Sequence, residues 1–193
     1  MAKDLEILAA PSVDPQIWKH ELQHTDGQGG GQLSITNLSA GIKFKKGALI
    51  NFDFTTKEVN PVKNALVVAG GTTSAPRVTK KHLFKVGDFV YVSGDAVTIN
   101  AINTSNSAYD VLTLSAACTG ATAGAIIVQA LAAGATPAAK YTANVILGNR
   151  VKIVAGVTVD CIYKVDQWVE KARIPYPVSA ATVSALNPNI ILK

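Results

Sequence analysis

The chain has few charged and few aromatic side chains for its length. Of its 193 residues, 16% are charged and 6% are aromatic, whereas 48% are hydrophobic. This balance argues against a disordered protein and against a nucleic-acid-binding arm, and the length allows a hydrophobic core of ordinary size. A glycosidase would need two opposed carboxylates and usually several aromatic side chains to hold the sugar, so the low aromatic content argues against that class too.

Cysteine is scarce, since the sequence contains two, Cys118 and Cys161. Neither belongs to a Cys-x-x-Cys motif or has the spacing of metal ligands. No histidine lies in a comparable strand or turn near Cys118, so a nucleophilic role for this thiol is disfavoured. We expect two buried thiols in a reducing compartment.

Long hydrophobic runs are also missing. No segment reaches the roughly 18 apolar residues of a membrane span, and the first residues lack the apolar core of a signal peptide. We therefore expect synthesis in the cytoplasm and no membrane partner.

Motifs for cofactor or metal binding are absent in the same way. The glycine-rich stretch 27–31 lacks the Lys-Ser/Thr of a P-loop and the Gly-x-Gly-x-x-Gly order of a dinucleotide site. His20 and His24 have the spacing of a helical metal site, but only Glu21 or Asp26 could supply a third ligand. We expect no cofactor and no metal.

Paired carboxylates for acid–base catalysis are scarce as well. Asp88, Asp95 and Asp110 all lie next to predicted turns, where aspartate commonly accepts hydrogen bonds from its own backbone. Because the sequence predicts no catalytic nucleophile, metal site or pair of catalytic carboxylates, we expect a protein that is not an enzyme.

The chain does contain a series of short Val/Ile/Thr-rich segments in which apolar and polar residues alternate. They begin with the stretch 80–92 and continue at 96–102, 109–114 and 125–128. Period-2 alternation between turn residues predicts strands, and in 96–102 it places Val97, Ile99 and Ala101 on one face. The last segment is apolar on both faces, which predicts a central strand. We predict a small β-barrel at about 77–130.

The same pattern continues on both sides of this barrel. Further candidate strands are 32–36, 48–54, 64–69, 141–147, 150–154, 157–169 and 189–192. Gly148-Asn149 predicts a hairpin turn between two of them, and 165–172 could instead be helical. Ser179 can cap a short helix over 180–186. The predicted fold class is all-β: a small β-barrel or sandwich and a C-terminal β region with one short helix.

The first 31 residues differ from the rest of the chain. They combine an arm of at most one or two helical turns with the glycine-rich stretch, whose backbone entropy predicts a flexible hinge. We divide the chain into this arm and hinge, 1–31, and a β-rich region, 32–193.

Three apolar side chains in the arm are candidate anchors for a partner: Ile17, Trp18 and Leu22. A large aromatic residue on a flexible tether suits insertion into a pocket on another protein. Folding of Trp18 back onto the chain's own barrel is the alternative.

The formal net charge is +5, with lysines spread along the chain. The densest groups are Lys43 to Lys46 and a candidate basic surface at Lys80, Lys81 and His82. Lysines on strands commonly protect an exposed sheet edge, whereas binding of an anionic partner would weaken steeply with salt. Edge protection is the favoured interpretation, and a nucleic-acid partner is disfavoured.

Several segments together resemble a known family. They are the stretch Lys-Lys-His-Leu-Phe-Lys-Val-Gly-Asp-Phe-Val at 80–90, the strands 97–102 and 109–114, and the ending at 174–178 and 186–190. In these segments the chain is similar to head fibre or capsid decoration proteins of tailed bacteriophages, especially those that infect gut Bacteroidetes. The resemblance covers about the last two-thirds of the sequence.

This resemblance implies a non-enzymatic virion protein on the capsid surface, commonly a trimer, bound to the outside of the major capsid protein lattice. It carries over no catalytic residues, and weak binding to host surface glycans would suit such a protein. The alternative is a β-barrel ligand-binding module that recognises a polysaccharide or nucleic acid through Lys80, Lys81 and His82.

Overall fold

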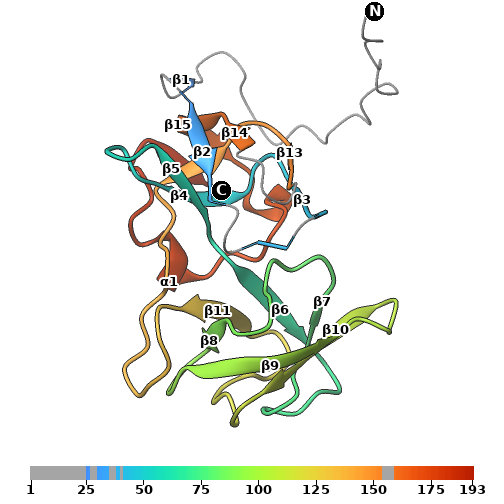
Figure 1. Cartoon of the computed structure of the whole chain (residues 1–193). Helices are drawn as coiled ribbons and strands as arrows, with labels where there is room; N and C mark the ends of the chain where they lie inside the picture. The colour runs from blue at the N-terminus through green and yellow to red at the C-terminus, as the bar shows by residue number, and fades with distance from the viewer. Residues whose placement is uncertain (1–24, 27–29, 35–37, 40, 154–158) are drawn as a thin grey trace, which may run out of the picture.

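The computed structural model describes residues 25–26, 30–34, 38–39, 41–153 and 159–193. These residues form two lobes stacked end to end (Figure 1). The barrel lobe contains strands β6 to β11, and the sheet lobe contains the strands before and after them in the chain. The predicted all-β fold class is confirmed.

The barrel lobe is a closed barrel with the strand order β10-β7-β6-β11-β8-β9, in which all neighbours are antiparallel. Its strands are β6 (Asn64–Val68), β7 (Arg77–Thr79), β8 (Phe89–Tyr91), β9 (Val97–Asn103), β10 (Tyr109–Leu114) and β11 (Ile126–Ala130). The barrel begins at Asn64 rather than at about 77, because β6 pairs with both β7 and β11 and so closes the sheet. Strand β11 has a neighbour on each side, as its apolar sequence predicts.

A β-bulge changes the predicted alternation in β9. Ala101 lies opposite Thr113 and Ile99 lies opposite Leu114, so Asn100 is the extra residue. Val97 and Ile99 are buried in the barrel as predicted, but Ala101 is exposed and Ile102 packs against the core instead. The prediction for Ala101 was wrong because a bulge reverses which residues face inward.

The sheet lobe is built around a sheet with the order β1-β15-β12-β4-β5-β2-β14. Its strands are β1 (Thr25–Asp26), β2 (Gly31–Leu33), β4 (Leu49–Phe52), β5 (Glu58–Pro61), β12 (Val145–Leu147), β14 (Val159–Cys161) and β15 (Tyr163–Val169). Ile162 alone separates β14 from β15, although the two lie far apart in the strand order. One bent segment therefore pairs with both β2 and β12, and the sheet wraps around its own core.

Three further strands complete the sheet lobe. They are β3 (Lys43–Phe44), β13 (Val151–Lys152) and β16 (Ile190–Leu192). Strand β3 pairs with β13, and β16 pairs in parallel with β15. In the paired strand β3, Lys43 is exposed and Phe44 is fully buried, the alternation expected of a strand with one solvent face.

The chain path inserts the barrel lobe into the sheet lobe. Strands β1 to β5 precede the barrel and β12 to β16 follow it, and all of them except β3 and β13, which pair with each other, join the same sheet. In Figure 1 the chain runs from β5 directly into β6 at the junction between the two lobes, which we call the waist. Gly31, which the sequence analysis assigned to the hinge, is the first residue of β2, while residues 27–29 lie outside the described residues.

The predicted hairpin at Gly148-Asn149 was wrong. Strands β12 and β13 do not pair with each other; β12 pairs with β4 and β15, whereas β13 pairs with β3 and lies against β14. Gly148 lacks the positive φ that a type I′ turn needs, and its N–H donates to the Ile162 carbonyl. The two strands therefore belong to different sheets and do not fold back on each other.

The C-terminal predictions are partly confirmed. A strand, β15, occupies 163–169, so the helical alternative at 165–172 is limited to the 3₁₀ turn η1 (Lys171–Arg173). The helix α1 (Ala180–Val183) is shorter than predicted, and the Ser179 side chain makes no capping hydrogen bond. The final extended segment is confirmed as β16.

Candidate functional site

The candidate site lies at the waist, where the segment 80–86 passes between the two lobes. Leu83 belongs to the core of the sheet lobe, whereas its neighbour Phe84 belongs to the core of the barrel lobe. Because consecutive side chains are anchored in different cores, the backbone here is held from both sides. The polar residues beside Leu83 and Phe84 therefore have well-defined positions.

Lys80 and Asp110 form the first ion pair of the waist. The Lys80 Nζ lies 2.6 Å from Asp110 Oδ1 and donates to the Thr104 carbonyl at 2.8 Å. Asp110 is buried within β10, so the prediction that it makes a local turn was wrong. Its carboxylate faces basic residues that follow β7, the strand to which β10 is paired.

His82 packs beside the same carboxylate. Its side chain is 6% exposed, and its Nε2 lies 3.3 Å from Asp110 Oδ2 without a hydrogen bond. The Phe84 N–H donates to His82 Nδ1 at 3.2 Å, so in the neutral ring the proton resides on Nε2. Burial lowers the pKa of His82, which the neighbouring Asp110 carboxylate only partly opposes. His82 is therefore neutral at neutral pH.

Lys81 differs from its two neighbours. It is exposed and has a φ of 66°, in the left-handed region that non-glycine residues seldom adopt. The three residues of the predicted basic surface therefore lie in different environments. Lys80 is paired with an aspartate, Lys81 is exposed, and His82 is a buried neutral imidazole. Proximity in sequence did bring the three residues to one site.

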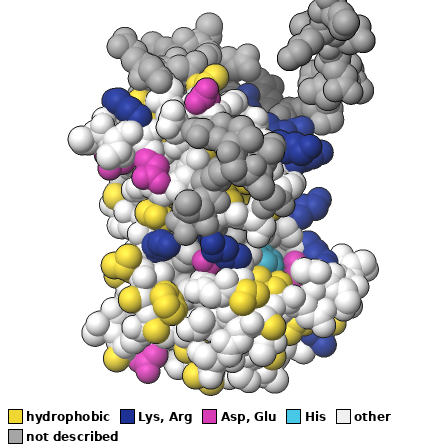
Figure 2. All heavy atoms as spheres, viewed as in Figure 1, with side chains coloured by type: hydrophobic (Ala, Val, Ile, Leu, Met, Phe, Trp, Pro, Cys, Tyr) yellow, Lys and Arg dark blue, Asp and Glu magenta, His cyan; other side chains and the backbone are white. Residues whose placement is uncertain are grey.

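A groove of about 540 Å³ lies over this site, and we call it the waist groove. Its lining includes Lys81, His82, Lys85, Val86, Ile102 and Asp110. On the face drawn in Figure 2, a histidine side chain and basic side chains of the Lys or Arg class gather at the waist above hydrophobic side chains of the barrel lobe. The waist groove therefore combines cationic, hydrogen-bonding and apolar surfaces.

A second polar cluster is almost fully buried, and no sequence pattern predicted it. The Lys63 Nζ lies 2.8 Å from Asp88 Oδ2, with side chains 0% and 5% exposed, and Gln129 Nε2 donates to Asp88 Oδ1 at 2.9 Å. Asp88 also accepts the Lys85 N–H, the local turn bond that was predicted. Burial lowers the pKa of Lys63, opposed by the Asp88 carboxylate. No local signal marks Lys63, because its partner lies 25 positions away.

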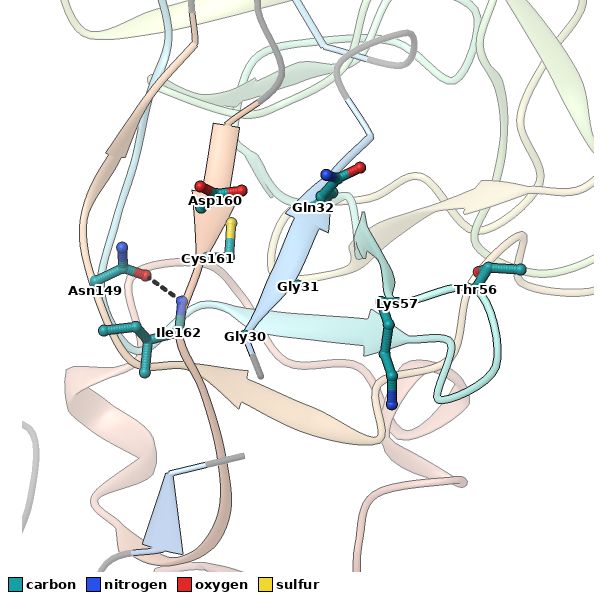
Figure 3. Close-up of a pocket in the computed structure, with 9 residues that line it drawn as sticks. All are labelled: Gly30, Gly31, Gln32, Thr56, Lys57, Asn149, Asp160, Cys161 and Ile162. Atoms are coloured by element: carbon teal, nitrogen blue, oxygen red, sulfur yellow. Dashed lines mark hydrogen bonds between the residues drawn. The ribbon is translucent and has the colours of Figure 1, made fainter. Parts of the chain in front are cut away.

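A second depression, of about 610 Å³, lies on the sheet lobe where β2 meets β14 (Figure 3). Gln32 and Asp160 are partners across these strands. The Ile162 N–H donates to Asn149 Oδ1 at 2.9 Å, the bond drawn in Figure 3. Cys161 also lines this depression, and burial raises the pKa of its thiol to about 12, helped by Asp160. The thiol is therefore protonated and a poor nucleophile.

Both cysteines are free and buried, as predicted. Burial also raises the pKa of Cys118, which lies in the barrel core. Across the described residues, no three His, Cys, Asp or Glu side chains lie close enough together to hold a metal ion. In the same part of the chain, no helix has the length and apolar character needed to cross a bilayer.

The candidate anchor residues Ile17, Trp18 and Leu22 lie outside the described residues, as do His20 and His24. They stay predictions from the sequence. The described chain starts at β1, whose residues Thr25 and Asp26 pair with β15 on the sheet lobe.

We compared the chain with protein-family models, curated proteins and solved structures. No family model matches the chain, and no curated protein or solved structure matches it either. Any function must therefore be inferred from the residues and geometry of the chain itself.

Proposed function

We propose that this protein is a non-enzymatic structural protein of a tailed-phage virion that decorates the outside of the capsid. The sequence resemblance at 80–90, 97–102 and 109–114 is the starting point. The structural observation that best supports the proposal is the pairing of the buried charges: Asp88 is paired with the buried Lys63, and the buried Asp110 is paired with the half-buried Lys80. Each pair joins residues far apart in the sequence, and neither pair is presented in a reactive arrangement.

The distribution of exposed apolar side chains also supports this role. Among the residues that the structure describes, the large hydrophobic side chains exposed at the surface occur on both lobes and are those of Phe54, Val86, Leu131, Ile162 and Ile191. Leu131 is the most exposed, at 63%. Single exposed apolar residues are common on monomers, but in a lattice-bound oligomer such residues would be covered by neighbours.

In this proposal the partners are the major capsid protein lattice and further copies of the same chain, most simply as a trimer. The protein would be made in the cytoplasm of the bacterial host and would function on the virion surface. Ile17, Trp18 and Leu22 are the proposed anchor to the lattice.

The proposal is tested with the full-length chain in two measurements. Light scattering at micromolar concentration should give the mass of a trimer, and the protein should co-sediment in a saturable way with capsids that lack it. Trp18→Ala should weaken co-sedimentation, whereas Trp18→Phe should retain most of it. A monomer that does not bind capsids would refute the proposal.

Two further variants would locate the contact. Leu131→Ser changes an exposed residue after β11, and Ile191→Ser changes an exposed residue of β16. Neither side chain belongs to a buried core, so both variants should fold normally. Loss of trimer in one variant alone would assign the contact between copies to that lobe.

A further inference from the structure

We propose that the waist groove binds a carboxylated sugar, a pyranose ring with an acid group such as a uronate. This activity goes beyond the proposed structural role and does not depend on it. Three features of the groove carry the inference: its size, a lysine with no ion pair among the described residues, and a buried imidazole whose Nε2 has no hydrogen bond to them.

The size and walls of the groove suit one or two sugar rings. Its volume of about 540 Å³ is within the usual range for small-molecule sites. Val86, which is 57% exposed, and the half-buried Ile102 provide an apolar wall. The C–H face of a pyranose ring can pack against such a wall.

Lys81 supplies the charge that an acid group would need. Within the described part of the chain it makes no ion pair, in contrast to Lys63 and Lys80. Its backbone has a φ of 66°, a conformation that non-glycine residues seldom adopt and that is found often at ligand sites. An exposed ammonium group held at the edge of a groove is suited to bind a carboxylate.

His82 and Asp110 supply a donor and an acceptor side by side. The Nε2 of His82 is buried and makes no hydrogen bond to any residue that the structure describes, although it lies 3.3 Å from Asp110 Oδ2. An unsatisfied buried donor destabilises the folded protein, and a hydrogen bond to a ligand oxygen would remove that cost. Asp110 can accept a hydrogen bond from a hydroxyl group in return. Neighbouring hydroxyls on a sugar present this combination of acceptor and donor.

A nucleic-acid strand fits the same groove less well. Backbone binding needs several phosphate contacts, whereas Lys81 and Lys85 are the lysines in its lining. Single-stranded binding also needs exposed aromatic rings on which bases stack, and Phe84, the aromatic ring in the lining, is 4% exposed. The carboxylated sugar is therefore the favoured ligand class.

The test is an NMR titration of the full-length protein with a trimer of galacturonic acid, beside the methyl ester of the same trimer. We expect saturable shifts of the amides of His82, Val86 and Ile102, and affinity for the ester at least about tenfold weaker. Equal affinity for acid and ester, or shifts that do not saturate, would overturn the proposal. So would equally tight binding of a short single-stranded oligonucleotide at the same groove.

A matched pair of variants isolates the lysine side chain. Lys81→Gly removes the charge and suits the positive φ, so the fold should be retained. Lys152→Gln removes the same charge from an exposed position on β13. We expect Lys81→Gly to weaken binding of the acid at least about fivefold and Lys152→Gln to leave it unchanged. Unchanged affinity in Lys81→Gly, or equal weakening in both, would refute the role of Lys81.

Discussion

At the scale of single residues, the Lys63–Asp88 pair is the most demanding feature of the fold. Both side chains are almost fully removed from water, and their oxygen and nitrogen atoms lie 2.8 Å apart. A buried ion pair gains stability only when its remaining hydrogen-bonding capacity is satisfied. Gln129 and the backbone N–H of Lys85 provide those bonds to the carboxylate.

We predict that Lys63→Met lowers the free energy of unfolding by about 3–5 kcal/mol, because it leaves the Asp88 carboxylate buried without its cation. Urea denaturation measures this change. The control Lys152→Met removes an exposed lysine and should alter stability by less than about 0.5 kcal/mol. Adding Asp88→Asn to Lys63→Met should restore part of the loss. A loss below about 1 kcal/mol in Lys63→Met would contradict the buried pair.

His82 gives a second residue-scale prediction, a dependence of stability on pH. Burial lowers the pKa of folded His82, so the unfolded chain takes up a proton near pH 6.5 while the folded chain does not. The unfolded state then binds more protons, and stability must fall as the pH is lowered through this region toward the folded pKa.

The measurement is the free energy of unfolding at about pH 7.5 and about pH 5.5, a range in which most carboxylates stay ionised. We expect the decrease at the lower pH to be smaller in His82→Gln, which retains an N–H donor without a titrating ring. An equal decrease in both proteins would mean that His82 does not carry this dependence.

At the scale of elements, strand β2 depends on a glycine for close packing. A Cβ on Gly31 would lie 2.6 Å from Phe52 Cε2 and 2.7 Å from Val59 Cγ2. The Phe52 ring is also stacked on Tyr163, with centroids 4.0 Å apart. The glycine thus lets β2 lie directly over the aromatic core of the sheet lobe.

We predict that Gly31→Ala destabilises the protein by about 1–3 kcal/mol through overpacking. Near-UV circular dichroism should change as well, because Phe52 and Tyr163 must move. Gly124→Ala is the matched control: its φ of 89° imposes backbone strain, but nothing lies within 4 Å of the added Cβ. It should lower stability without altering the aromatic signal. An unchanged spectrum in Gly31→Ala would show that β2 can shift without cost to the aromatic stack.

At the scale of the whole molecule, the two lobes are joined by side-chain contacts as well as by the covalent chain. Leu83 reaches from the waist into the core of the sheet lobe. The Asn64 Nδ2 donates to Thr182 Oγ1 and to the Pro177 carbonyl, both at 3.0 Å, and so links β6 to the C-terminal segment. These contacts should make the lobes unfold together.

Native-state hydrogen exchange tests this coupling. In the wild-type chain, Leu112→Ala in the barrel core should lower the exchange free energy of the slowest amides in both lobes, by about 2–5 kcal/mol. In a Leu83→Ala background, which removes one of the two links, the same substitution should affect the sheet lobe less than it does in the wild-type chain. Effects confined to the barrel lobe in the wild-type chain would contradict coupling through the waist.

Local pattern was sufficient for much of the β structure. Strands β10 and β11 coincide closely with predicted segments, because alternation and turn residues are read within a few positions. Asn100 and Gly148 show where prediction from local sequence pattern fails. A bulge and the absence of a hairpin depend on which strand lies opposite, and that information is not contained in the segment itself.

By itself, the sequence determined the all-β class, the burial of Cys118 and Cys161, and the extended C-terminus, since each follows from composition and short-range periodicity. The tertiary structure alone decided the insertion of the barrel, the wrapping of the sheet through β14 and β15, and the waist groove. These features depend on contacts between distant positions, such as Asn64 with Thr182, 118 residues apart. Such pairings are selected by the packing of the whole chain, which no local pattern encodes.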